Sequence, residues 1–219
     1  MKIKINIDIK VGRVVKYLVL SDLFLLFGWG FIDPIFSVFI IERIAGATLV
    51  TVGIAAALYW ILKSLLQIPI AKYLDRTAGE KDDFTALIGG LLLAGFSALA
   101  FSWIDRPWQL YVVQVVHAVG FALYIPSWSS IFSRHLDHDR VAFDWSLDST
   151  VAGIAEGASG LIAGIIAAMW GFVSIFVLAG IFSLVAAIAL ITVPDLIIPK
   201  PNKAAEVEIK EKSAPAAKL

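Results

Sequence analysis

The sequence predicts an all-α membrane protein with six transmembrane helices, arranged as two three-helix repeats of inverted topology. Three observations predict this fold: the apolar composition, six long apolar stretches, and short sequences that recur in the two halves of the chain. The chain has 219 residues, of which 59% are hydrophobic and only 16% charged, and its mean hydropathy is +0.86. Soluble domains carry about 25% charged residues, and a soluble globule of this length could not bury so much apolar surface.

The composition excludes several classes of protein. An ordinary soluble enzyme, a nucleic-acid-binding protein or a disordered chain would carry far more polar residues. The chain has no cysteine, which excludes a disulfide framework, a thiolate zinc site and a cysteine nucleophile. We therefore expect a protein that lies in the lipid bilayer, is not an enzyme, binds no nucleic acid and holds no cofactor and no metal.

Six apolar stretches are long enough to cross a bilayer, which takes about 20 residues of helix. The expected spans are residues 18–41, 49–71, 84–104, 108–131, 148–169 and 172–193. Residues 1–17 are expected to form a cytoplasmic segment. Their isoleucines alternate with polar residues as in a short strand, although a basic flank on the membrane surface is the preferred interpretation. Residues 194–219 are rich in Lys, Glu, Ala and Pro and are expected to be a disordered cytoplasmic tail.

Lys and Arg residues set the expected orientation of these spans, because cytoplasmic loops are enriched in them. Only Arg43 and Arg106 lie in the loops on one side, and Lys63 lies inside the second span. Every other Lys and Arg falls in the two termini or in the loops after the second and fourth spans. We therefore expect a multi-pass protein of the plasma membrane, the inner membrane in bacteria, with both termini in the cytoplasm.

The echo between the two halves of the chain predicts an internal repeat. Thr-Val-Gly-Ile-Ala at 51–55 opens the second span, and Thr-Val-Ala-Gly-Ile-Ala at 150–155 opens the fifth. Gly-Phe followed by Pro34 in the first span corresponds to Gly-Phe followed by Pro126 in the fourth. Because each repeat has three spans, the second copy is inverted in the membrane, an arrangement typical of secondary transporters. Chance matches of small residues in apolar sequence are the alternative explanation.

The two prolines of this echo have an expected structural effect. Proline has no backbone N–H and its ring clashes with the preceding turn of a helix. Pro34 and Pro126 are therefore expected to kink the first and fourth spans.

The loop after the second span carries the most specific motif in the chain. Its sequence is Ala71-Lys72-Tyr73-Leu74-Asp75-Arg76-Thr77-Ala78-Gly79-Glu80-Lys81. It resembles the loop motif Gly-x-x-x-Asp-Arg-x-Gly-Arg-Lys/Arg of the major facilitator superfamily. Asp75, Arg76, Gly79 and Lys81 match in type, whereas Ala71 replaces the first glycine and one extra residue precedes Gly79. In that family the Asp caps a helix of the opposite half and latches the outward-open state, and a plain basic turn is the alternative.

The resemblance covers residues 14–193 and implies a single six-helix half of a major facilitator fold. Because family members usually carry two such halves, it implies that two copies associate in parallel as a homodimer. The implied function is a half-size secondary transporter of a small organic solute that works by alternating access, with protons as the candidate coupling ion. A non-transporting membrane scaffold or assembly protein, a fragment of a longer transporter, and a half that pairs with a different half remain open. The substrate and the direction of transport stay open as well.

Ionisable residues within a bilayer are costly, so each one is a candidate functional residue. Asp33 lies just past the middle of the first span, and His117 lies at similar depth in the fourth. Since the resemblance makes both spans cavity-lining, Asp33, Gln114, His117 and Tyr124 are predicted to line a substrate or proton pathway. For His117, a hydrogen bond that only fixes helix packing is the alternative. Asp22, nearer the end of its span, is expected to be solvated.

Lys63 and Glu156 lie at similar depth in the second and fifth spans. In the family, these two spans of opposite halves pack together. We therefore predict that Lys63 of one copy pairs with Glu156 of its partner, twice by symmetry. A pair within one chain, and a Lys63 side chain that extends to the cytoplasmic interface, are the alternatives.

Several other residues have two possible roles. Trp29, Trp60 and Trp128 lie deep enough in their spans to shape a cavity for an apolar or aromatic ligand, or else they face lipid. The fifth span contains glycines at 153, 157, 160 and 164, which are suited to close helix packing. Gly-Ala-Ser-Gly at 157–160 is similar to the nucleophile motif of rhomboid proteases, but those enzymes need a later His, and all three His residues precede Ser159.

Overall fold

The computed structural model describes residues 11–76 and 79–194. The predicted N-terminal segment and the C-terminal tail lie mostly outside these residues, so the division at 17 and 194 stays a prediction. The described chain is helical and contains no strand. Its helices are α1 (Arg13–Gly30), α2 (Phe36–Arg43), α3 (Leu49–Leu74), α4 (Lys81–Ala100), the 3₁₀-helix η1 (Phe101–Trp103), α5 (Pro107–Arg134), α6 (Val141–Trp170) and α7 (Phe172–Ile191).

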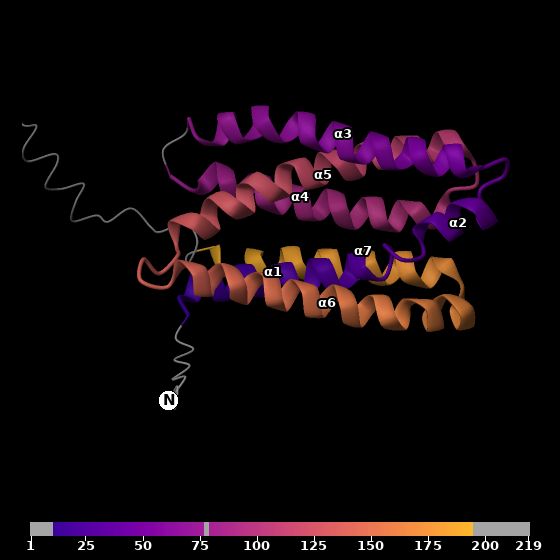
Figure 1. Ribbon diagram of the computed structural model, residues 1–219. Helices are drawn as coiled ribbons and strands as arrows, with labels where there is room; N and C mark the ends of the chain where they lie inside the picture. Colours follow the sequence, from indigo (N-terminus) through magenta and orange to yellow (C-terminus); the bar gives the residue numbers. More distant parts are fainter. Residues whose placement is uncertain (1–10, 77–78, 195–219) are drawn as a thin grey trace, which may run out of the picture.

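The long helices form two layers that run side by side along one axis (Figure 1). One layer contains α3, α4 and α5, and the other contains α1, α6 and α7. Within the layers, α5 packs against α3 and α4, while α1 packs against α6 and α7; between the layers, α4 packs against α7. The apolar core therefore lies along α1, α4, α5 and α7, and α3 and α6 bury the least of their surface.

Local sequence signals explain where several helices begin and end. The backbone N–H of Thr48 donates to Thr51 Oγ1 at 3.0 Å, which caps the start of α3. Pro107 occupies the first turn of α5, where its missing N–H costs nothing. Gly171, with a φ of 78°, separates α6 from α7 in a conformation that favours glycine.

Five helices are long and apolar enough to cross a membrane: α3, α4 with η1, α5, α6 and α7. They correspond to the second to sixth predicted spans. The first predicted span, 18–41, is not a single helix in the structure, because α1 ends at Gly30 and α2 begins at Phe36. Pro34 lies in the turn between them. The structure thus supports a helical membrane protein, whereas the count of six uniform spans is not confirmed.

Two further differences from the expected spans have simple physical causes. Helix α6 begins at Val141, seven residues before the predicted start at 148, because Asp144 and Asp148 interrupt the apolar residues of its first turns without ending the helix. Helix α5 continues through Pro126 as far as Arg134, so this proline, unlike Pro34, does not lie between two helices.

Close contacts between helix backbones fix the two layers. A Cβ atom added to Gly90 of α4 would lie 2.7 Å from the carbonyl oxygen of Gly120 in α5. A Cβ added to Gly30 of α1 would lie 2.8 Å from Cα of Glu156 in α6. By contrast, the predicted glycine face of α6 is largely open, since Gly153, Gly157 and Gly164 have no neighbouring atom within 4 Å of such a Cβ.

Candidate functional site

A cavity of about 230 Å³ lies where the break between α1 and α2 faces α3 and α5. At the break, the Trp29 carbonyl accepts hydrogen bonds from the N–H groups of Ile32 and Asp33 at 2.8 and 3.1 Å. The polar and large aromatic residues in the cavity lining are Trp29, Asp33, Tyr59, Trp60, Gln114 and His117. An interrupted helix beside a cavity is how transporters bring irregular backbone to a binding site.

Three aromatic rings are stacked in the wall of this cavity. The imidazole of His117 lies 4.1 Å from the indole of Trp29, at an interplanar angle of 8°. On its other face lies the Tyr59 ring, at 4.2 Å and 16°. The imidazole is therefore held between two aromatic faces, one from α1 and one from α3.

Hydrogen bonding fixes the tautomer of neutral His117. Its Nδ1 lies 3.1 Å from Oε1 of Gln114, and an amide oxygen can only accept, so Nδ1 donates. In the neutral ring, Nε2 is then an acceptor. This atom is shielded from solvent and has no hydrogen-bond partner in the described part of the chain, and the same holds for Nε1 of Trp29. Because buried polar atoms are usually paired, both atoms suit a bound molecule or water.

The charged groups around the cavity differ in how they are paired. Asp33 is exposed at its edge, and no hydrogen bond or ion pair joins its carboxylate to another described residue. The Lys63 ammonium lies 3.8 Å from the ring centroid of Trp60 and 5.0 Å from that of Tyr59. Lys63 is only 7% exposed and lies just outside the cavity lining.

The cavity brings together three of the four residues predicted for the substrate or proton pathway: Asp33, Gln114 and His117. The structure places the fourth, Tyr124, elsewhere. Its hydroxyl donates to the carboxylate of Asp22 in α1. Trp29 and Trp60 line the cavity, whereas the Trp128 indole donates to the Leu18 carbonyl at 3.4 Å.

A second polar cluster, which the sequence reasoning missed, joins α1, α5 and α6. The expectation that Asp22 is solvated was wrong, because Asp22 is 8% exposed and bonded to Tyr124. Asp148 is also 8% exposed and interacts electrostatically with Asp22 and Tyr124. A usable signal existed for Asp22, which lies within an apolar stretch just as Asp33 does. Asp148 was hidden by the predicted start of the fifth span.

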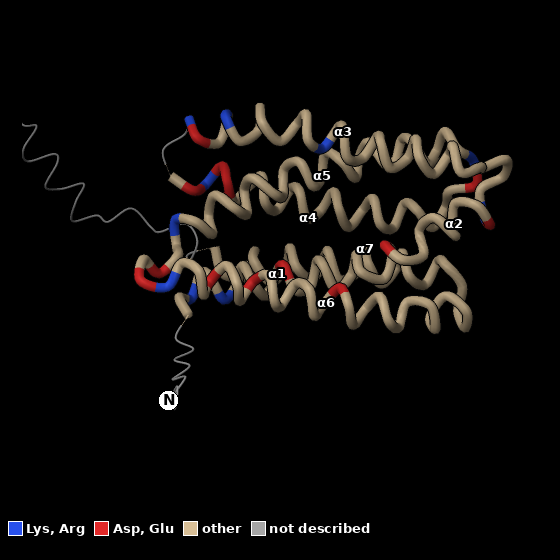
Figure 2. The backbone as a smooth tube through the Cα atoms, in the orientation of Figure 1, with Lys and Arg blue, Asp and Glu red and all other residues tan. Residues whose placement is uncertain are grey.

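Lys63 and Glu156 are not paired within the described chain. The Lys63 side chain is covered by its own aromatic neighbours, whereas Glu156 is exposed on α6. Gly30 of α1 lies directly against the Glu156 backbone. Figure 2 shows that charged residues gather at the two ends of the helices and are sparse along their middle parts.

The motif loop is attached to the end of α5. Asp75 and Arg76 are exposed just after α3, and Lys81 begins α4. The carbonyl of Gly79, whose φ is 107°, accepts from Arg134 Nη1 at 3.1 Å. Nη1 also lies 2.6 Å from Oδ2 of the buried Asp83. Neither Asp83 nor Arg134 was predicted from the sequence as a site residue.

Two titratable groups lie beside this contact. His135 Nδ1 and Glu80 Oε1 are 3.5 Å apart. Burial raises the pKa of Glu80, and this effect outweighs the opposing influence of His135 and Arg134.

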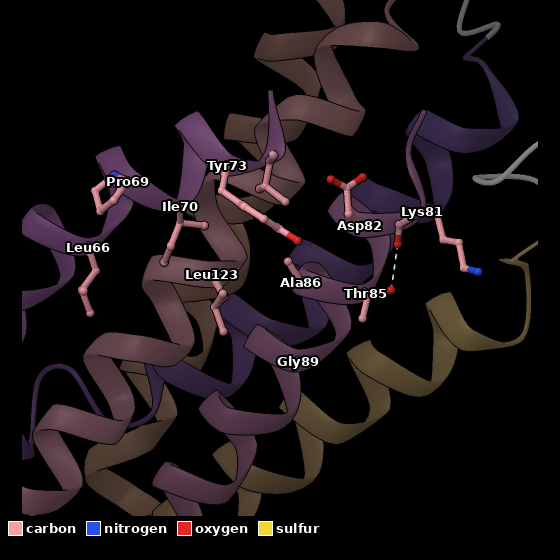
Figure 3. A pocket seen from close by; sticks show the side chains of 11 residues that line it. Leu66, Pro69, Ile70, Tyr73, Lys81, Asp82, Thr85, Ala86, Gly89 and Leu123 are labelled. Carbon is pink, nitrogen blue, oxygen red and sulfur yellow. Dashed lines mark hydrogen bonds between the residues drawn. The ribbon is translucent and has the colours of Figure 1, made fainter. Parts of the chain in front are cut away.

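A larger hollow of about 850 Å³ lies between α3 and α4 near this loop (Figure 3). Much of its lining is aliphatic, with Leu66, Ile70 and Leu123 among its residues. Thr85, at its loop end, donates to the Lys81 carbonyl of its own helix at 2.7 Å. The smaller cavity is the better candidate site, because it contains unpaired polar atoms at depth.

Ionisable and polar side chains around a cavity between membrane-spanning helices are typical of proteins that move solutes or ions across a bilayer. Comparison with known families gives the particular family. The model of the Major Facilitator Superfamily matches residues 18–218, and the chain therefore belongs to this superfamily of membrane transporters. A search of individual curated proteins found no match.

Proposed function

We propose that this chain is a half-size secondary transporter that moves a small organic solute by alternating access, as a parallel homodimer. The observation that carries the proposal is the cavity at the α1–α2 break, in which Asp33 and Nε2 of His117 lack partners among the described residues. A protein that only needed stability would avoid such groups inside a membrane, since each costs free energy unless it binds something.

The packing of the helices supports the proposed inverted repeat. In the proposed repeat, α1 corresponds to α5, α3 to α6 and α4 to α7. Under this correspondence, each major contact between two helices has a counterpart between the corresponding helices, and the contact of α4 with α7 is its own counterpart. The contact of Gly120 in α5 with α4 has its counterpart in the contact of Gly28 in α1 with α7, whereas the echoed Gly30 lies against α6. Inverted repeats of this kind allow one set of helices to rock against another around a central site.

Two features support a second copy as the facing half. Helices α3 and α6 bury least of their surface, and both border the surface from which the resemblance expects the other half to approach. The open glycine positions of α6 would let a partner helix approach closely. In the proposed dimer, Lys63 of one copy pairs with Glu156 of its partner, which fixes the register of the two halves.

The proposed orientation places the protein in the inner membrane with both termini in the cytoplasm. The ends of α3 and α5 and the starts of α1, α4 and α6 carry most of the Lys and Arg in the described spans and loops. Arg43 and Arg106 lie at the opposite end. This asymmetry supports the orientation because basic residues are retained on the cytoplasmic side.

Solute-dependent flux in proteoliposomes tests the proposal. Purified chain is reconstituted with and without a pH gradient, and uptake of a panel of small organic solutes is measured. At least one solute should accumulate, and Asp33→Asn should abolish its uptake, whereas Glu42→Gln, on exposed α2 outside the cavity, should not. Absence of flux, together with a stable complex with a different protein, would favour the scaffold alternative.

A further inference from the structure

The cavity at the α1–α2 break has an unusual combination of aromatic walls and an unpaired carboxylate. We infer that it binds a protonated organic amine with a flat apolar body. This inference rests on the proposed function only in taking the cavity as the solute site. Four properties of the cavity carry it: the ring faces, the Asp33 charge, the position of Lys63, and the unpaired ring nitrogens.

The walls of the cavity suit a flat apolar group. Trp29, Tyr59 and Trp60 come from two different helices, and Phe36 and Phe101 complete the aromatic lining. Aromatic faces attract both other rings, by offset or edge contacts, and cations, by their negative electrostatic potential. A ligand that offers a ring and a positive charge uses both properties of such a lining.

The charge that the cavity presents is negative. Asp33 lines it and forms no hydrogen bond or ion pair within the described residues. A carboxylate beside a low-dielectric cavity strongly favours a cationic partner, because water competes less there than at an open surface. A neutral solute would leave this charge without compensation, and an anion would be repelled.

Lys63 shows that the neighbouring ring faces accept a cation. Its ammonium lies over Trp60 at 3.8 Å and over Tyr59 at 5.0 Å, and it does not line the cavity. A ligand ammonium at Asp33 would approach the same two rings from the cavity.

The unpaired nitrogens identify the head group more closely. With Nδ1 of His117 donating to Gln114, Nε2 of the neutral ring is an acceptor, as is the Asp33 carboxylate. Two acceptors suit an ammonium that still carries N–H groups. The unpaired Nε1–H of Trp29 is a donor and suits an oxygen elsewhere on the ligand or a bound water.

Three probes with the same ring and different head groups test the inference: 2-phenylethylamine, 2-phenylethanol and 3-phenylpropanoate. Each is titrated at neutral pH into the full chain in lipid nanodiscs, and binding is followed by calorimetry and by the intrinsic tryptophan fluorescence. We expect the protonated amine to bind at least about tenfold more tightly than the alcohol, a difference of about 1.4 kcal/mol. The propanoate should bind most weakly.

Matched variants separate the role of the charge from general packing. Asp33→Asn should remove the preference for the amine over the alcohol, whereas Glu42→Gln, an exposed carboxylate on α2, should preserve it. Equal binding of amine and alcohol, preferred binding of the propanoate, or no binding of the amine to the folded protein would each overturn the inference.

The binding measurement and the flux measurement test the amine site and the transport proposal separately. If the amine binds through Asp33 but no solute crosses the liposome membrane, the cation site stands and the transport proposal fails. If flux is observed only for neutral or anionic solutes, the transport proposal stands and the amine site is wrong.

Discussion

The guanidinium of Arg134, at the end of α5, lies 2.6 Å from the carboxylate of Asp83, near the start of α4. Asp83 is fully buried, whereas the Arg134 side chain is 37% exposed. The same guanidinium holds the Gly79 carbonyl, so a single side chain joins the motif loop to both helices. Arg134 therefore attaches the loop that carries the motif residues Asp75 and Arg76 to the end of α5.

The two members of this pair should respond differently to mutation. Arg134→Gln leaves a buried carboxylate without its cation, whereas Asp83→Asn leaves an arginine that can reach water. Arg134→Gln should therefore destabilise by about 2–3 kcal/mol, and Asp83→Asn by less. Thermal unfolding in detergent measures both. Arg76→Gln, on the same loop but exposed, is the control, and equal losses for all three variants would contradict the prediction.

Two adjacent glycines of α4 provide a second test. A Cβ at Gly90 would lie 2.7 Å from the backbone of Gly120 and of Tyr124, whereas a Cβ at Gly89 meets no atom within 4 Å. Gly90→Ala should force α4 and α5 apart and cost about 1–3 kcal/mol. Gly89→Ala should be neutral or stabilise slightly, because alanine favours the helix. A matched loss of melting temperature in both variants would show that the two helices are not packed as described.

The sequence predicted the helical membrane fold well, because apolar stretches of this length leave a chain few alternatives. Its failures came from properties that hydropathy does not measure. Hydropathy averaged over a window of residues joins residues 18–41 into one span, because the turn around Pro34 is as apolar as the helices beside it. The predicted start of the fifth span was placed at 148 because Asp144, Ser146 and Asp148 interrupt the apolar residues in the first turns of α6, although these turns are helical.

The depth of polar residues in the predicted spans found Asp33 and His117, but grouping Tyr124 with them left out the distance between residues along one helix. Tyr124 lies seven residues after His117, two helical turns along α5, where it meets Asp22 rather than the cavity. Tyr59 gave no comparable signal, because a tyrosine in an apolar helix is unremarkable until it is found against His117. Contacts between distant helices therefore had to come from the structure.

The proposed pairing of Lys63 with Glu156 is tested by cross-linking. The chain has no cysteine, so Lys63→Cys and Glu156→Cys introduce the only thiols. When the two single variants carry different tags and are mixed, an oxidant should give a product that bears both tags. Lys63→Cys mixed with Ile188→Cys, at an exposed position of α7, should give none. A monomer in lipid, or equal cross-linking of the control pair, would rule out the proposed interface.

The buried pair Asp22 and Asp148 carries the last prediction, which concerns the coupling of transport to protons. No Lys or Arg of the described chain forms an ion pair with either carboxyl group, and two ionised carboxylates at such depth would be very costly. The pair should therefore retain a proton until one of its members reaches water.

If that proton is the coupling ion, Asp148→Asn should abolish solute accumulation driven by a pH gradient and preserve exchange of solute across the membrane without a gradient. Asp105→Asn, in the loop at the other end of the helices, should leave both activities intact. Accumulation that survives in Asp148→Asn and in Asp22→Asn alike would show that protons are carried elsewhere, and an equal loss of exchange would mean that the cluster serves structure alone.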